Sequence, residues 1–122
     1  MKTSELTGAA LGYAVAIADR RIIRNGIGGS LEVRGRTEDG EELPDGWDMW
    51  MLWYPQANWA QGGPIIERGE IAVWADSEGG WLASANEGRG FDYNGHTPLI
   101  AAMRCYVASK LGDEVEIPKE LQ

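Results

Sequence analysis

Residues 96–112 read His-Thr-Pro-Leu-Ile-Ala-Ala-Met-Arg-Cys-Tyr-Val-Ala-Ser-Lys-Leu-Gly and carry the strongest helix signal of the chain. Thr97 suits the N-cap position, where its hydroxyl accepts from a backbone N–H of the first turn. Pro98 suits the first helical position, where a missing N–H costs nothing. Gly112 suits the left-handed residue just beyond the end. These signals predict a helix that begins after Thr97 and ends before Gly112.

This helix is apolar over most of its circumference. At about 100° per residue, its large side chains share one broad face. They are Leu99, Ile100, Met103, Tyr106, Val107 and Leu111. Only Arg104 and Lys110 clearly require water. A helix of this kind is usually buried, so we expect a sheet against its large face and another helix or a partner subunit against its small face.

A second helix is predicted near the N-terminus. Thr3 or Ser4 can cap a helix that runs to about Asp19, because apolar residues recur there at helical spacing. Gly8 and Gly12 lie one turn apart inside it, although glycine costs about 1 kcal/mol relative to alanine in a helix. Close approach of the small face of the last helix would explain both glycines.

Short strands are expected between the two helices. Residues 21–24 and 31–34 flank glycine turns, and residues 70–75 and 81–85 flank a hairpin loop. Residues 47–54 are apolar on both faces. That stretch predicts a central strand with both faces covered, or a strand whose second face meets a partner or ligand.

The remaining segments are expected to be mostly irregular. Residues 37–46 and 87–95 are predicted as loops, and residues 56–63 as a loop that contains Trp59. Residues 64–69 are predicted as one short helical turn, opened by Pro64 and closed by Gly69.

We therefore predict a single α+β domain over residues 1–122, with an acidic extended tail at 113–122 in which Pro118 forbids further helix. Its mostly antiparallel, Trp-rich sheet packs with an N-terminal helix and a buried C-terminal helix.

Composition narrows the function classes. The formal net charge of −8 argues against binding to a phosphate backbone, so nucleic acid is not an expected partner. The one cysteine, Cys105, cannot form an internal disulfide and fits a reducing compartment. No apolar run approaches the roughly 20 residues that span a bilayer, and residues 1–5 lack a signal-peptide pattern. We expect a cytoplasmic protein with no membrane partner.

Catalytic motifs are sparse. The one histidine, His96, precedes Cys105 by more than two turns of the same helix, so a rise of about 1.5 Å per residue separates them by more than about 10 Å. That separation excludes a Cys-His nucleophile within one chain. No carboxylates show metal-ligand spacing, and no cofactor motif is present. We expect a binding protein without a cofactor; a small enzyme of unknown reaction is the third hypothesis.

Two stretches carry a candidate binding site. Trp59 either covers a sheet edge or offers a flat surface for stacking a base or a partner side chain. The glycine-rich loop at 88–97 is either a mobile surface loop or an anion site that joins one arginine to a helix N-terminus. If the two stretches face each other, the ligand-binding residues are Trp59, Arg89, Gly95, His96 and Thr97.

Several long, ordered stretches carry a family resemblance. They are Met1-Lys-Thr-Ser-Glu-Leu-Thr-Gly-Ala-Ala-Leu11, Tyr54-Pro55, Trp59-Ala-Gln-Gly-Gly-Pro-Ile-Ile-Glu67 and Thr97-Pro-Leu-Ile-Ala-Ala-Met-Arg-Cys-Tyr-Val-Ala-Ser-Lys-Leu-Gly-Asp-Glu-Val115. Together they resemble the NinX-like family of small proteins encoded by tailed phages and prophages. The resemblance implies a phage accessory protein in a bacterial cytoplasm and brings no catalytic residues. Counter-defence follows only by analogy with other small early phage proteins.

Two function hypotheses from different classes result. In the first, the protein sequesters a small nucleotide-like ligand through aromatic stacking and a helix N-terminus. In the second, the acidic runs at 38–48 and 113–120 make it an inhibitor that binds a basic host protein. In either case we expect a homodimer, because so small a domain leaves apolar surface that a second copy would cover.

Overall fold

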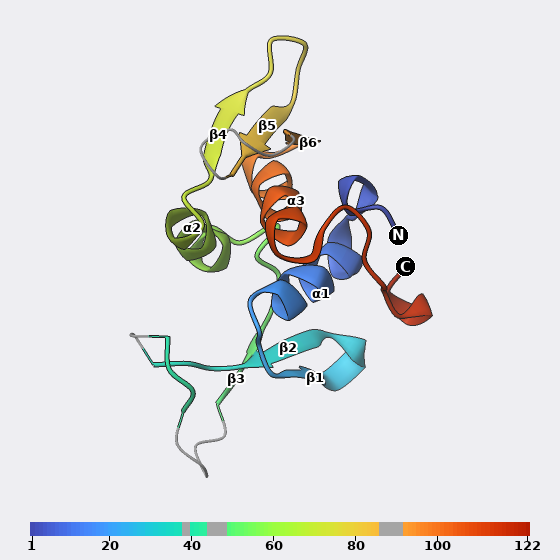
Figure 1. Cartoon of the computed structure of the whole chain (residues 1–122). Coiled ribbons are helices and arrows are strands. Elements are labelled where there is room, and N and C mark those ends of the chain that lie inside the picture. The colour runs from blue at the N-terminus through green and yellow to red at the C-terminus, as the bar shows by residue number, and fades with distance from the viewer. Residues whose placement is uncertain (38–39, 44–48, 86–91) are drawn as a thin grey trace.

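The computed structural model describes residues 1–37, 40–43, 49–85 and 92–122 (Figure 1). The α-helices in this part are α1 (Gly8–Ala18), α2 (Trp59–Arg68) and α3 (Pro98–Leu111). The strands are β1 (Ile23–Asn25), β2 (Leu31–Arg34), β3 (Trp50–Leu52), β4 (Ala72–Ala75), β5 (Trp81–Ser84) and β6 (Tyr93–Gly95). Short 3-10 turns occur at Thr3–Glu5, Ile27–Gly29 and Lys119–Leu121. None of the helices described here is long and apolar enough to cross a bilayer.

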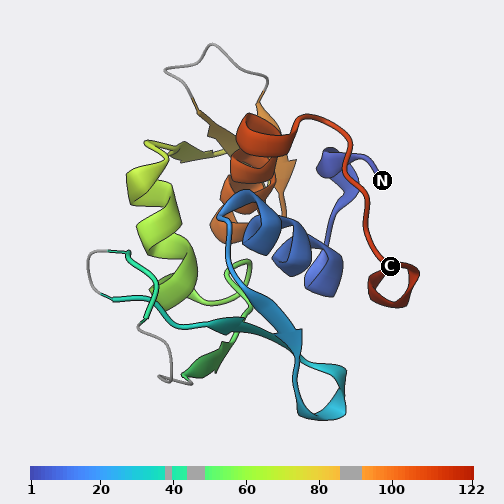
Figure 2. The same cartoon turned by 60° about the horizontal axis from the view of Figure 1, so that its bottom comes forward.

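The predicted α+β class is confirmed, with the strands divided between two antiparallel sheets. In the described part of the chain each sheet has three strands, in the orders β1-β2-β3 and β4-β5-β6. Figures 1 and 2 show the two sheets at opposite ends, with the helices between them. α3 contacts β4, β5 and β6 on one side and α1 and α2 on the other, so it lies at the centre of the core.

The predicted boundaries of α3 are confirmed. The Thr97 hydroxyl oxygen accepts from the Ile100 amide at 3.1 Å, and Pro98 is the first helical residue. Gly112 has a φ of 91°, which other residues rarely adopt, and its amide donates to the Ala108 carbonyl at 2.9 Å. The expected neighbours, a sheet and another helix, both contact it.

The expectation that Arg104 requires water is wrong. Arg104 is only 9% exposed. Its Nε donates to the Leu6 carbonyl at 2.9 Å, and its Nη1 donates to the Asn94 carbonyl at 2.8 Å. A guanidinium has five N–H donors in a planar fork, so backbone carbonyls can replace much of its water.

α1 begins later than predicted. Thr3 forms part of a 3-10 turn and is fully buried, and its hydroxyl donates to the Gly112 carbonyl at 2.8 Å instead of capping the helix. Gly8, with a φ of 53°, starts α1. The segment that approaches Gly12 is not α3, because the Trp53 indole donates to the Gly12 carbonyl at 2.9 Å and the Gln56 side chain fills the space beside it.

The prediction of a central strand at 47–54 is wrong. Within the described residues, β3 pairs only with β2, so it forms an edge of its sheet. Most apolar side chains in and beside β3 are exposed: Met49 59%, Met51 42%, Leu52 53% and Tyr54 43%. Among the described residues of this stretch, Trp50 is half-buried and Trp53, just after the strand, is buried in the core.

The prediction of a loop at 56–63 is also wrong, because α2 starts at Trp59. The Asn58 side chain caps this helix by accepting from the Ala60 amide at 3.1 Å. Pro64 lies inside α2 and does not open it. A Cβ added at Gly62 would lie 2.6 Å from Leu99 Cδ2, so this glycine lets the first turn of α2 pack closely on the first turn of α3.

The C-terminal tail is fixed to the N-terminus. The Met1 amino group donates to the Val115 carbonyl at 2.8 Å, and the Val115 amide donates to the Met1 carbonyl at 2.9 Å. Ile117 is buried. Pro118 precedes a 3-10 turn at Lys119–Leu121, so the expectation that it forbids further helix is wrong; a proline before the first turn gives up no helical hydrogen bond.

Candidate functional site

A pocket of about 320 Å³ lies at the start of α3, and we call it the α3 pocket. It lies where the β4–β5 hairpin, the end of β6 and the side of α3 meet. Among the described residues, those that line it are Gly79, Gly80, Trp81, Asn94, Gly95, His96 and Arg104.

Two glycines of the hairpin turn shape one wall. Gly79 and Gly80 have φ values of 103° and 79°, in the left-handed region that favours glycine. The Asp76 side chain accepts from the Glu78 amide at 3.1 Å, and the Asp76 amide donates to the Gly80 carbonyl at 3.0 Å. This turn delivers Trp81 directly to the mouth of the pocket.

The opposite wall depends on close packing at Gly95. Gly95 pairs with Trp81 in the sheet register, which joins β6 to the hairpin. A Cβ at Gly95 would lie 2.6 Å from the Ala101 amide nitrogen and 2.8 Å from Ile100 Cγ2. Only glycine therefore allows the end of β6 to lie on the first turn of α3.

Arg104 gives the pocket its electrostatic character. Its two hydrogen bonds go to neutral carbonyls, and no carboxylate pairs with it within the described residues. Burial lowers the pKa of Arg104 from its usual value, although an arginine remains charged at neutral pH. The pocket therefore borders a largely buried positive charge without a counter-ion.

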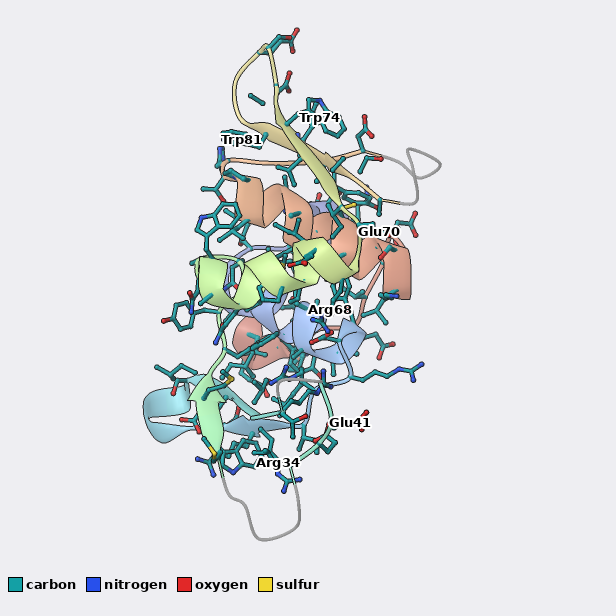
Figure 3. The ribbon with its side chains drawn as sticks, turned by 90° about the vertical axis from the view of Figure 1, so that its left-hand side faces the viewer. Arg34, Glu41, Arg68, Glu70, Trp74 and Trp81 are labelled. Atoms are coloured by element: carbon teal, nitrogen blue, oxygen red, sulfur yellow. The ribbon has the colours of Figure 1, made fainter. Side chains whose placement is uncertain are left out.

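The other polar and aromatic groups lie nearer the surface. Trp81 is half-buried, and Asn94 and His96 are exposed. Figure 3 shows Trp81 and Trp74 on the side of α2 occupied by the second sheet. Together the pocket offers an indole face, an amide, an imidazole and a guanidinium, which are groups for stacking and hydrogen bonding.

The structure brings together part of the predicted site. Gly95 and His96 line the α3 pocket, and Thr97 follows them as the cap of α3. Because Thr97 accepts from Ile100 and Pro98 has no N–H, the helix N-terminus offers a ligand fewer amides than usual. Arg89 lies outside the described residues.

Trp59 lies on a neighbouring element. It is the first residue of α2, is 58% exposed, and is not among the described residues that line the pocket. Gly62, one turn later in α2, packs against Leu99. Trp59 is therefore close to the start of α3 but outside the pocket wall.

Sequence reasoning missed Trp81, Asn94 and Arg104. The sequence feature that points to Trp81 is its position directly after the Gly79-Gly80 turn. In the sheet, Trp81 pairs with Gly95 in the segment that leads into α3. A signal for Arg104 was its isolation as a charge in the middle of an apolar helix. The sequence alone does not show that Trp81 and Arg104 lie at the same site, because it is the pairing of β5 with β6 that brings them together.

Cys105, the neighbour of Arg104 on α3, is buried, and burial together with the charge of Asp92 raises its pKa to about 11. Its thiol is therefore protonated at neutral pH and a weak nucleophile. The described residues contain no group of three or more His, Cys, Asp or Glu side chains arranged to hold a metal ion.

The comparisons with known proteins identify a family. No curated protein matches the chain at a significant level of sequence similarity. The family model described as "Bacteriophage P22, NinX" matches residues 2–110, which include every described residue that lines the α3 pocket. Because this match spans nearly the whole chain, the protein belongs to the NinX family of bacteriophage P22.

Proposed function

We propose that this phage protein is a non-enzymatic accessory protein that sequesters a small nucleotide-like ligand in the α3 pocket. The observation that carries the proposal is the position of Arg104, a buried cation with no carboxylate partner among the described residues, in a pocket that also presents the indole of Trp81. A nucleotide supplies the two complementary parts, a flat base and a negatively charged phosphate.

The size of the pocket suits a small ligand. Its volume of about 320 Å³ lies at the lower end of the range of roughly 300–1,000 Å³ for ligand pockets. It favours a mononucleotide or cyclic mononucleotide over a dinucleotide.

The available interactions limit the affinity. Stacking on Trp81 is worth about 1–3 kcal/mol, and a charge-assisted hydrogen bond from Arg104 about 1.5–3 kcal/mol. Their sum, about 2.5–6 kcal/mol, corresponds to a dissociation constant of roughly tens of micromolar to more than ten millimolar. Sequestration then requires the protein in excess over its ligand, in the cytoplasm of the infected host. Removing a signalling nucleotide in this way is the form of counter-defence that fits the proposal.

Equilibrium dialysis against a panel of mono-, di- and cyclic nucleotides tests the proposal. Trp81→Leu should weaken binding at least about fivefold, because it removes the stacking surface. Trp59→Leu is the matched control, since it removes an exposed indole outside the pocket wall. The proposal fails if no nucleotide binds. It also fails if Trp59→Leu alone weakens binding, because the stacking indole would then be that of α2 and not Trp81.

The acidic tail supports the alternative function, inhibition of a basic host protein. Asp113, Glu114, Glu116 and Glu120 are all exposed. The hydrogen bonds between Met1 and Val115 hold the backbone at the start of this tail against the N-terminus. An exposed acidic surface is suited to electrostatic steering toward a basic partner.

A further inference from the structure

A second and larger cleft, of about 490 Å³, lies between α2, the end of α1 and the β1–β3 sheet. We call it the arginine cleft, because Arg21, Arg36 and Arg68 line it. Figure 3 shows Arg68 on the side of α2 directed away from Trp74 and Trp81. The arginine cleft is therefore separate from the α3 pocket and shares no described lining residue with it.

Among the described residues, positive charges outnumber negative ones in the cleft. Asp19, whose side chain is 5% exposed, is the buried carboxylate that the three arginines share. Its Oδ2 lies 3.5 Å from Arg36 Nη1 and 3.8 Å from Arg21 Nη1, and its Oδ1 lies 3.3 Å from Arg68 Nη2. Oδ1 also accepts from the Tyr106 hydroxyl at 3.0 Å. One buried carboxylate thus faces three guanidinium groups.

A second carboxylate reduces the excess without removing it. Glu42 Oε1 lies 3.4 Å from Arg36 Nε, at the rim, where its side chain is 47% exposed. With Glu42 counted, the described groups still leave one positive charge uncompensated, in a protein whose overall charge is −8.

Two of the arginines are held in place before any ligand arrives. Arg21 lies over the Trp53 ring, 5.0 Å from its centroid, and its Nη2 donates to the Arg34 carbonyl at 3.0 Å. Arg36 Nη2 donates to the carbonyls of Asp19 at 2.9 Å and Arg20 at 2.7 Å. Such fixed guanidiniums lose little freedom when they bind an anion.

One donor in the cleft is unsatisfied. Arg21 Nε is buried and makes no hydrogen bond within the part of the chain that the structure describes. Burial lowers the pKa of Arg21, and the positive charge of Arg36 lowers it further. Nearly all buried polar groups in proteins have a partner, so this N–H is a donor that one further acceptor could satisfy.

The third arginine shows that the cluster is not simply a buried ion-pair network. The Arg68 side chain is 53% exposed and sits at the mouth of the cleft, where its pairing with Asp19 contributes little stability because water screens it. Its Nε donates to the Pro64 carbonyl at 3.3 Å, and its Nη2, which pairs with Asp19, is the group that can turn toward a ligand. The cleft walls formed by Met51, Trp53 and Pro64 provide apolar surface for the organic part of that ligand.

From these observations we propose that the arginine cleft is an oxyanion site, in which Arg21, Arg36 and Arg68 bind the phosphate group of a small phosphate monoester. A monoester carries enough negative charge to compensate the one positive charge that the described groups leave, and its three acceptor oxygens can bond to several guanidinium groups at once. The proposal does not depend on nucleotide binding in the α3 pocket.

The test follows arginine Nε–H signals by nitrogen–proton NMR while inorganic phosphate, phenyl phosphate or benzoate is added at constant ionic strength. Phenyl phosphate should shift the Arg21 signal with saturation and bind more tightly than inorganic phosphate, since its ring covers the apolar wall. Benzoate, with one charge, should bind at least about tenfold more weakly than phenyl phosphate.

Arg68→Gln should weaken phenyl phosphate binding at least about tenfold by removing one charge-assisted donor. Arg24→Gln, the matched control, makes the same charge change on β1, where Arg24 pairs with Glu32 outside the cleft, and should bind like the unmodified protein. Trp81→Leu should also bind phenyl phosphate normally. The proposal is overturned if no shift saturates, if benzoate binds equally well, or if Arg24→Gln weakens binding as much as Arg68→Gln.

Discussion

Replacing Arg104 by alanine tests how the buried guanidinium contributes to the fold. Arg104 joins three parts of the chain, because it extends from α3 to the Leu6 carbonyl and to the Asn94 carbonyl in β6. The two acceptors are 98 and 10 residues away in sequence. Loss of this side chain therefore loosens both the N-terminal segment and the wall of the α3 pocket.

The magnitude follows from the bonds that are lost. Hydrogen bonds to a charged group contribute about 1.5–3 kcal/mol each, so the two together are worth roughly 3–6 kcal/mol. The cost of burying the guanidinium offsets part of this, and water entering through the α3 pocket can satisfy the Asn94 carbonyl. We expect a net loss of about 3 kcal/mol, which lowers Tm by roughly 10 °C for a chain of this length.

Urea denaturation followed by circular dichroism measures this loss. Lys110→Ala is the control on the same helix, because Lys110 is exposed and its contact with the Tyr106 ring, at 5.9 Å, is weak. Arg104→Met keeps much of the side-chain volume and should still lose most of the stability. If Arg104→Ala and Lys110→Ala agree within about 0.5 kcal/mol, the hydrogen bonds of Arg104 are not stabilising and the reasoning is refuted.

Four further predictions concern packing, pH, assembly and surface charge. Met103→Asp should unfold the protein, because Met103 is fully buried, whereas Met49→Asp at a 59% exposed position should leave the melting curve nearly unchanged. Burial and the nearby Asp19 raise the pKa of Tyr106 to about 12, so stability present below about pH 10 should be lost as the pH rises toward 12; Tyr106→Phe should reduce this loss in alkaline urea titrations. The exposed apolar edge at β3 should pair with a second copy, and sedimentation that gives a monomer at high micromolar concentration would count against a homodimer. If the acidic tail docks on a basic partner, the double variant Glu114→Gln, Glu116→Gln should associate with that partner more slowly and with a weaker salt dependence. An unchanged association rate would exclude inhibition of a basic host protein through this tail.

The parts of the fold that depend on local signals could be predicted from the sequence. Thr97, Pro98 and Gly112 define the ends of α3 through bonds within a few residues, and the structure confirms them. The β4–β5 hairpin likewise follows from the glycine turn at 79–80. Such signals act over one or two turns of chain and need no knowledge of distant contacts.

The errors arise where distant contacts decide the outcome. Arg104 is buried because carbonyls of Leu6 and Asn94 meet it, which no periodicity in α3 reveals. Thr3 has good capping chemistry, but its hydroxyl bonds to Gly112 at the other end of the chain. The start of α2 was missed because Pro64 is a stronger local signal than the cap residue Asn58.

The candidate site shows the same division. The sequence placed Gly95, His96 and Thr97 together because they precede a clear helix start, and the first two line the α3 pocket. Trp81 joins them only through its pairing with Gly95 in the sheet. The cluster around Asp19 gathers arginines from three separate segments, so the run of arginines early in the sequence gave no indication that Arg68 belongs with Arg21 and Arg36.

The most direct test of the proposed function is an NMR titration of the unmodified protein with purine mononucleotides and cyclic mononucleotides, reading the tryptophan indole N–H signals and the backbone amides. The account predicts saturable shifts at the Trp81 indole and at the amides of Gly95 and His96, while the Trp59 indole moves less. Shifts that do not saturate, or that appear only away from the α3 pocket, would contradict it.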